Sequence, residues 1–302
     1  MKRKLVKLGE STIMISLPQK WINKFNLKKG DEIELEEKDN MIEITTDLKT
    51  EIKEKEIELN GMDPYSVKRY LSALYRTGYD NISFRYDNSE LIKPIQEVVE
   101  TQLIGFEIID QSTKSCSIKN LSGAQEDQLE NTMSRTLLLL NTISKDFIES
   151  IKKNDFETIK NIKYMDNNIN KFTNFCRRIL TTKGHPKYKK TMFYYQFMGE
   201  IENISDEFSF MAEYCSEKKP KLTKEMIELY EKIDQLIRKL NTLYMKFDLN
   251  SADKLIIEIG IVNSIIRMQY KNSEADPYII SYLDHIVKRT SNATGTLLTI
   301  NT

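Results

Sequence analysis

The sequence contains few residues of the types that build disulfide frameworks or metal sites. Its 302 residues include only 3 Cys and 2 His. Cys116, Cys176 and Cys215 are widely spaced and odd in number, so neither a disulfide framework nor a thiolate zinc site is indicated. His185 and His285 have no second His or Cys at ligand spacing, which gives no support to metal ligation or general acid chemistry. We expect buried thiols and structural histidines.

Long apolar runs and catalytic fingerprints are also absent. No stretch approaches the roughly 20 consecutive apolar residues of a membrane span, and the start of the chain lacks the apolar core of a signal peptide. We therefore expect a cytoplasmic protein without direct membrane insertion. No GxSxG, HExxH, Walker or Rossmann pattern occurs, and no nucleophile has an attendant base. The sequence does not indicate an enzyme.

What the sequence does contain is typical of a folded, helix-rich protein. Hydrophobic residues make up 40% and charged residues 30%, with 10 Gly and 6 Pro, and the length allows two or three domains. The formal net charge is zero, but the charges are distributed unevenly. The region from Asp31 to Glu58 is mainly acidic, whereas the first thirty residues contain Glu10 as their one acidic residue. The basic residues of this start are Lys2, Arg3, Lys4, Lys7, Lys20, Lys24, Lys28 and Lys29.

Residues 1–48 show the period-two alternation of short strands. Pro18 ends one strand, because it cannot donate to a ladder, and can open a short helix. Gly30 with Asp31 supplies a turn. The predicted elements are a strand at 5–8, a turn at GEST, a strand at 13–17, a helix at 19–26, a strand from Ile33, a turn at Asp39 and Asn40, and a strand at 41–44. So small a unit with so many strand edges hides its apolar faces poorly, and we expect a homodimer.

The motifs KLGEST, ISLP and LKKGDEIELE in this region closely resemble the AbrB-like (SpoVT-AbrB) swapped-hairpin domain. Domains of that family are intertwined dimers that bind DNA through basic residues on the N-terminal strands and loop. The resemblance implies that role for Lys2, Arg3, Lys4, Lys7 and Lys20. This sequence has one arginine among these residues, which does not favour bidentate reading of base edges.

Residues 51–121 predict a small α/β connecting domain. IKEKEIELNG has the pattern of a strand, and Asp63 with Pro64 forms an N-cap and N1 pair for a helix that ends at Gly78. A second strand spans 82–86, and SELIKPIQEVVETQLIG forms a second helix in which Pro94 lies near the first turn or causes a kink. FEIID and CSIKN predict a hairpin. No phosphate loop or catalytic triad occurs, so we expect this domain to connect its neighbours or to help dimerisation.

Residues 122–302 predict an all-helical domain. Apolar residues recur at steps of three and four, and breaks fall near Asn154, at KGHP, at KKP and at NSEADP. Six helices divide at Pro220 into two three-helix repeats, 122–219 and 220–302. The second of the six is expected as one helix over 155–180. The predicted fold class is therefore multidomain α+β, with a small β domain, an α/β domain and a duplicated three-helix bundle.

Carboxylates in the first repeat lie at helical spacing. Glu202 and Asp206 are four residues apart and share one helix face, and Asp166 is followed four residues later by Asn170. Oxygen ligands that converge from two helices are a common way to build a metal site in a bundle. The alternative is a solvated helix face.

These features resemble the PhoU family of phosphate-signalling regulators, which consist of two three-helix repeats with ExxxD or DxxxD motifs that hold metal clusters in some members. The resemblance implies Asp166, Glu202 and Asp206 as candidate ligands of a divalent or trivalent metal such as iron, manganese, zinc or magnesium. In the second repeat the corresponding positions are Asn263 with Arg267 and Asp284 with Lys288. Cations there repel a metal ion and can pair with Asp284.

An AbrB-like domain fused to a PhoU-like domain resembles archaeal phosphate-uptake regulators. The resemblance implies a phosphate-responsive transcriptional regulator that binds DNA through the basic hairpin domain and senses or relays a signal through the helical bundle. One alternative is a PhoU-type adaptor that dimerises through its N-terminal domain and contacts a phosphate transporter or kinase without binding DNA. A further alternative is a metal-binding or storage protein.

Overall fold

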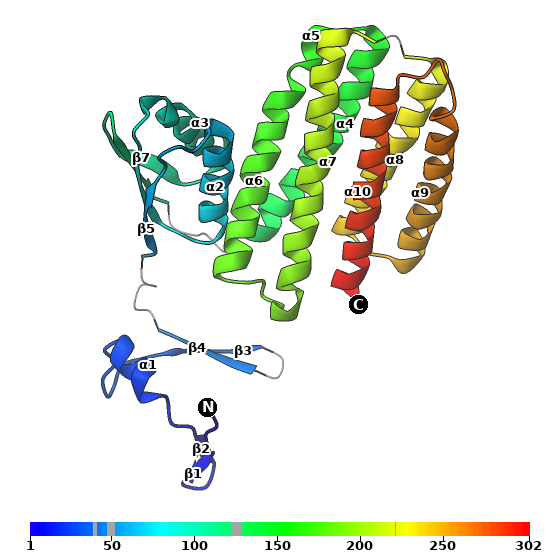
Figure 1. The fold of residues 1–302 in the computed structure, drawn as a ribbon. Helices are drawn as coiled ribbons and strands as arrows, with labels where there is room; N and C mark the ends of the chain where they lie inside the picture. Colours follow the sequence, from blue (N-terminus) through cyan, green and yellow to red (C-terminus); the bar gives the residue numbers. More distant parts are fainter. Residues whose placement is uncertain (39–40, 47–51, 123–127, 221) are drawn as a thin grey trace. The chain divides into compact units, whose positions relative to one another are not determined.

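The structure is a computed structural model that describes residues 1–302 except 39–40, 47–51, 123–127 and 221 (Figure 1). The chain divides into two compact units, Met1–Ile52 and Lys53–Thr302. Each unit is described by itself below.

The first unit consists of two separate hairpins with a short helix between them. β1 (Val6–Leu8) pairs antiparallel with β2 (Thr12–Met14), and β3 (Glu34–Lys38) pairs antiparallel with β4 (Met41–Thr45). Helix α1 (Gln19–Lys24) begins directly after Pro18, whose fixed φ suits a helix start. The predicted order of two strands, a helix and two strands is confirmed in the described residues. The turn predicted at Asp39 and Asn40 lies outside them.

The second unit begins with a four-stranded sheet in the order β5-β6-β8-β7. β5 (Glu54–Glu58) runs parallel to β6 (Asn81–Arg85), and β8 (Ser115–Asn120) pairs antiparallel with both β6 and β7 (Phe106–Gln111). The crossover from β5 to β6 contains α2 (Pro64–Arg76), and α3 (Ile92–Gln102) precedes β7. The predicted cap of α2 is present, because the Asp63 carboxylate accepts the backbone N–H groups of Tyr65 and Ser66. Pro94 occupies the first turn of α3, one of the two predicted placements.

Residues 128–302 are helical, except for the short connections between helices. The elements are α4 (Leu129–Lys153), α5 (Phe156–Ile159), α6 (Ile162–Thr182), α7 (Thr191–Lys218), α8 (Lys224–Met245), α9 (Leu249–Gln269) and α10 (Pro277–Asn301).

The prediction of one helix over 155–180 is wrong, because the chain turns between α5 and α6. The backbone N–H groups of Lys160 and Asn161 bond to carbonyls three residues earlier, and Asp155 caps α5 through the N–H of Thr158. Ile159 and Ile162 on either side of the turn are both buried. The apolar spacing is therefore preserved across the turn, which is why periodicity did not reveal it.

The long helices form two sets of three that share one core. Helices α4, α6 and α7 pack together, as do α8, α9 and α10, and the sets meet where α7 packs on α10 and α4 on α8. A second, separate core lies between the sheet and helices α2 and α3, and these two helices also pack against α6. The fold class predicted from the sequence, a small β region, an α/β domain and an all-helical region, is confirmed.

None of the helices in the described part of the chain has an apolar segment long enough to cross a membrane.

The three cysteines are free and buried, as expected from the sequence. They are Cys116, Cys176 and Cys215. Burial raises the pKa of Cys116 to about 11 and that of Cys215 to about 12, so these thiols stay protonated at neutral pH.

Candidate functional site

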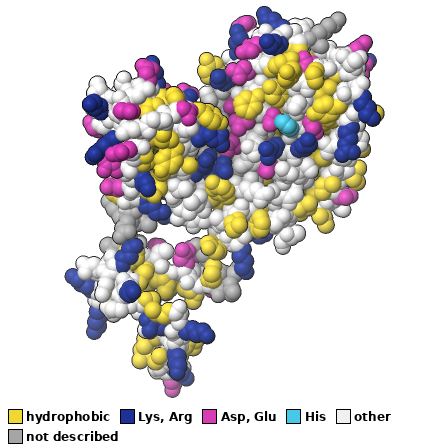
Figure 2. Space-filling model, in the orientation of Figure 1, with side chains coloured by type: hydrophobic (Ala, Val, Ile, Leu, Met, Phe, Trp, Pro, Cys, Tyr) yellow, Lys and Arg dark blue, Asp and Glu magenta, His cyan; other side chains and the backbone are white. Residues whose placement is uncertain are grey.

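The first unit has no interior of its own. None of its described residues is buried, although its strands are rich in apolar side chains. In Figure 2 these hydrophobic side chains lie exposed among the lysines of the unit. The large exposed hydrophobic side chains are Leu5, Val6, Leu8, Ile13, Met14, Ile15, Leu35, Met41 and Ile42.

The β1–β2 hairpin exposes apolar side chains on both faces. Val6 lies opposite Met14 on one face, and Ile13 lies opposite Lys7 on the other. Val6 and Ile13 are 55% and 65% exposed, so neither face of the hairpin is buried within the chain. A two-stranded hairpin without a packed face is marginal in water, so the first unit taken by itself has little to stabilise its fold.

The five predicted DNA-binding residues are all exposed. Lys2, Arg3 and Lys4 lead directly into β1, and Lys7 lies within it, so these four belong to one stretch of chain. Lys20 lies on another element, α1. Within the described residues none of the five makes an ion pair, so their charges are available to an external anion such as a phosphate backbone.

The predicted carboxylates of the first repeat lie close enough to affect one another. Asp166 is 6% exposed, and its carboxylate accepts hydrogen bonds from Ser205 Oγ at 2.5 Å and Asn170 Nδ2 at 3.3 Å. Burial raises the pKa of Asp166 to about 6. Burial, together with the charges of Asp166 and Glu202, raises the pKa of Asp206 to about 7. Both carboxyl groups therefore keep their protons to a higher pH than an exposed aspartate does.

Arginines accompany these carboxylates. Arg177 Nη1 donates to Glu202 Oε2 at 2.5 Å, and the guanidinium group lies over the ring of Tyr195 at 4.5 Å. Arg76 reaches α6 from α2 and donates to Asn174 Oδ1 at 3.1 Å. A cleft of about 260 Å³ between α2 and the α6–α7 pair is lined by both charge types. Its charged residues are Lys68, Arg69, Arg76, Glu202 and Asp206.

The described residues of this arrangement give no support to a resident metal ion. The described residues contain no group of three or more His, Cys, Asp or Glu side chains arranged to hold one. Glu202 is already neutralised by Arg177, and the nearby cation opposes a second one. Metal binding by Asp166, Glu202 and Asp206 therefore stays a prediction. In the second repeat Lys288 Nζ lies 2.8 Å from Asp284 Oδ2, as the sequence predicts.

Sequence reasoning missed the arginines that join the α/β domain to the bundle. Arg178 is 6% exposed and donates to the carbonyls of Tyr75 and Tyr79 and to Asp80 Oδ1, at 2.6, 2.8 and 2.7 Å. An indication was present in the helical segment FTNFCRRIL, where the two arginines are the only charged residues of nine. A helix of this kind is buried on more than one side, so a charge within it needs a partner.

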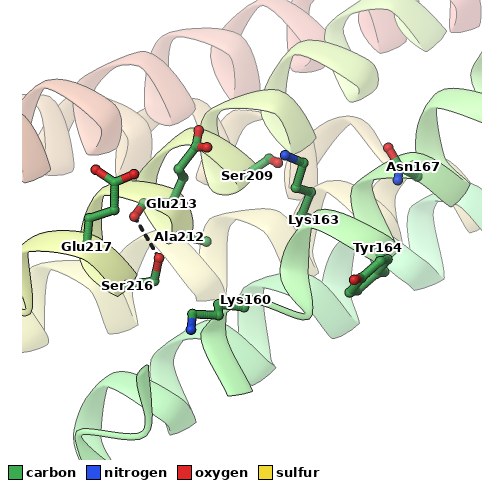
Figure 3. Close-up of a pocket in the computed structure, with 9 residues that line it drawn as sticks. All are labelled: Lys160, Lys163, Tyr164, Asn167, Ser209, Ala212, Glu213, Ser216 and Glu217. Carbon is green, nitrogen blue, oxygen red and sulfur yellow. Dashed lines mark hydrogen bonds between the residues drawn. The ribbon is translucent and has the colours of Figure 1, made fainter. Parts of the chain in front are cut away.

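A second cavity, of about 480 Å³, lies between the start of α6 and the end of α7 (Figure 3). Lys160 and Lys163 line it from the α6 side, and Glu213 and Glu217 from α7. Lys160 is already paired with Glu157. The lining combines both charge signs, so no charge type of ligand is favoured.

The histidines have local partners. His185 is buried, stacks on Tyr194 at 4.1 Å, accepts the N–H of Lys187 at Nδ1, and lies 3.0 Å from Glu130 through Nε2. These contacts occupy both ring nitrogens of His185 and hold the loop that precedes α7. A structural role accounts for it.

Comparison with known proteins concerns the two ends of the chain separately. Residues 6–51 match the family described as antidote-toxin recognition MazE, bacterial antitoxin. The first unit is similar to MazE antitoxins. This match supports the AbrB-like resemblance of residues 1–48 seen in the sequence. No curated protein matches the chain.

Among solved structures, the chain is similar to the phosphate transport system regulatory protein PhoU from Streptococcus pneumoniae. The TM-score is 0.47 at 14% identity, over 59% of this chain and 95% of that chain. The similarity falls on the helical part and is a distant one.

The raised pKa values of Asp166 and Asp206 predict a characteristic pH dependence of stability. A carboxyl group whose pKa rises on folding stabilises the fold fully below its unfolded value of 3.8, and this contribution is lost as pH rises through about 6 to 7. Relative to the wild type, Asp166→Asn/Asp206→Asn is expected to gain unfolding free energy on the order of 5 kcal/mol between pH 4 and pH 8. Urea denaturation at the two pH values measures this difference.

Asp155 provides a control, because its replacement is expected to change the stability with pH in the opposite direction. Hydrogen bonds from Thr158 lower the pKa of this exposed capping carboxylate. The stability of Asp155→Asn relative to wild type is therefore expected to fall as pH rises through the acidic range below about pH 4, where this carboxyl group ionises. A double variant of Asp166 and Asp206 whose stability differs from wild type by the same amount at both pH values contradicts the prediction.

Proposed function

We propose that the protein is a homodimeric, phosphate-responsive regulator of transcription that holds duplex DNA with its first unit. The observation that carries this proposal is a first unit without a single buried described residue, in which exposed apolar strands adjoin an unpaired cationic stretch. A second copy that interlaces with these strands covers the apolar faces and doubles the cationic residues. Such two-fold symmetry suits a pseudopalindromic duplex.

The match of residues 6–51 to MazE antitoxins supports this part of the proposal. The phosphate part rests on the sequence resemblance of the acidic motifs to PhoU, and the effector, which is inorganic phosphate or a signalling protein, acts through the helical bundle. In the proposed coupling, binding to the bundle changes the spacing of the two cationic stretches in the dimer. Differential affinity of the effector for the two spacings then changes the affinity for DNA.

Duplex binding titrated with salt tests the proposal. If about four to six phosphates are neutralised, log affinity falls with log salt at a slope of roughly −4 to −5. The variant Lys2→Glu/Arg3→Glu/Lys4→Glu is expected to bind at least about tenfold more weakly, with a shallower slope.

The control makes the same kind of charge reversal, at two residues instead of three, in another part of the first unit. Lys28→Glu/Lys29→Glu lies beside the Gly30 turn, outside the predicted contact residues, and is expected to bind close to wild type. Equal and negligible retention of the duplex by wild type and the triple variant sinks the proposal and favours the adaptor that contacts a transporter or kinase. Iron or manganese retained after loading favours the metal-binding alternative.

A further inference from the structure

Helix α9 exposes an apolar face that its own bundle leaves uncovered. It packs on α8 and α10 at the outer edge of the helical part (Figure 1). Leu255, Ile259, Val262 and Ile266 are buried on its inner side. Its exposed large hydrophobic side chains are Leu249, Ile256, Ile257, Ile261 and Met268, which are 46% to 66% exposed.

The exposed apolar residues lie on one face together with Gly260. At 100° per residue, Ile256, Ile257, Gly260, Ile261 and Met268 fall within an arc of about 140°. Glycine in the middle of a helix costs about 1 kcal/mol relative to alanine. A Cβ at Gly260 would meet nothing within 4 Å in this chain, so intrachain packing does not account for the glycine. Its position suits the close approach of another backbone from outside.

The charges on this face are complementary to those of a second copy. Asp253 precedes Gly260 by seven residues, and Arg267 follows it by seven. Both lie on the same arc and are exposed, and within the described residues neither makes an ion pair. An antiparallel α9 from a second copy, related by a two-fold axis at Gly260, therefore faces each Asp253 with the partner's Arg267.

We propose that the α9 face is a second self-association surface, on which an antiparallel α9 of another copy packs about a two-fold axis at Gly260. The occupant is a second copy of this chain. Because Asp253 and Arg267 are equally far from Gly260, the two-fold axis forms the Asp253–Arg267 pair twice, once at each end of the contact. The apolar residues between the charged ends then form the dry centre of the contact. This surface belongs to residues 53–302 and is independent of DNA binding by the first unit.

The test uses the full chain with first-unit pairing blocked by Val6→Asp/Ile42→Asp, so that the remaining association belongs to residues 53–302. Sedimentation equilibrium is expected to show a dimer. Asp253→Arg or Arg267→Asp alone is expected to raise the dimer dissociation constant about tenfold or more, because like charges then meet twice. Asp253→Arg/Arg267→Asp together is expected to restore it to near the parent value.

Two further variants separate association from folding. Gly260→Leu is expected to weaken the dimer while leaving the melting temperature of residues 53–302 unchanged or higher, since leucine favours a helix more than glycine does. Glu149→Arg, an equally exposed charge reversal on α4, is expected to leave the dimer unchanged. The proposal is overturned if the blocked chain is monomeric at about 100 µM, or if the double reversal does not recover what each single reversal loses.

Discussion

The variant Val6→Asp/Ile42→Asp is expected to unfold the first unit and to weaken duplex binding about 100-fold or more. Val6 and Ile42 are 55% and 68% exposed, one in each hairpin, and nothing described in the chain covers them. If a second copy buries them, a carboxylate at each position must be desolvated for the copies to pair, and pairing fails. Each isolated unit then lacks a core, and the two cationic stretches are no longer held side by side for one duplex.

Hydrogen exchange and fluorescence measure the first part of this result. The backbone amides of residues 1–46 are expected to lose their protection, whereas those of residues 53–302 keep theirs because the second unit has its own cores. Trp21 is the single tryptophan of the chain and lies on α1 within the first unit, so its emission is expected to shift toward that of a solvated side chain.

The control adds the same two charges away from the strand faces. Ser11→Asp/Asn23→Asp places them in the β1–β2 turn and on the exposed side of α1. It is expected to keep its protection and to lose only the affinity caused by added negative charge. If the two double variants show the same protection and bind the duplex within a few-fold of each other, the first unit does not depend on a partner.

The sequence was most informative where local chemistry determines the structure. Asp63 with Pro64 marked the start of α2 correctly, and Pro18 marked the start of α1. Apolar periodicity found the long helices and their grouping in threes, because each helix buries one stripe in a common core. The separation of α5 from α6 escaped detection, because two carbonyls accept at i−3 there while the buried positions stay in phase.

The site was less predictable, because its character depends on residues distant in sequence. Spacing placed Glu202 and Asp206 on one helix face, the PhoU resemblance added Asp166, and the structure brings the three into electrostatic contact. The partner of Glu202 is Arg177 on the neighbouring helix. Arg76 arrives from the α/β domain, 98 residues before its acceptor Asn174 in α6. No local pattern encodes such an approach. A carboxylate motif therefore predicts a cluster but not the cation that neutralises it.

Arg178→Ala is expected to cost about 3–5 kcal/mol of unfolding free energy in residues 53–302. The guanidinium group of Arg178 donates to two carbonyls at the end of α2 and to Asp80, and it lies over the rings of Tyr75 and Phe106 at 5.0 and 5.2 Å. Its loss leaves these acceptors without their donor in a buried contact between the α/β domain and the bundle. Urea denaturation followed by circular dichroism measures the cost.

Two conservative comparisons show whether geometry or charge determines this effect. Arg178→Lys keeps the charge but not the planar fork that reaches several acceptors at once, so it is expected to lose about half as much stability. Arg238→Ala removes an arginine that is 47% exposed and paired with Asp234 four residues earlier, and is expected to cost no more than about 0.5 kcal/mol.

Arg178→Ala is also expected to change the number of transitions in the urea denaturation curve. The second unit contains two separate cores, and Arg178 crosses the boundary between them. Removing this connection is expected to let the α/β domain unfold before the bundle, so that one denaturation transition becomes two. A single transition with an unchanged midpoint shows instead that the apolar packing of α2 and α3 on α6 holds the two parts together without Arg178. In that case the stability of the contact between the α/β domain and the bundle comes from this packing rather than from the arginine.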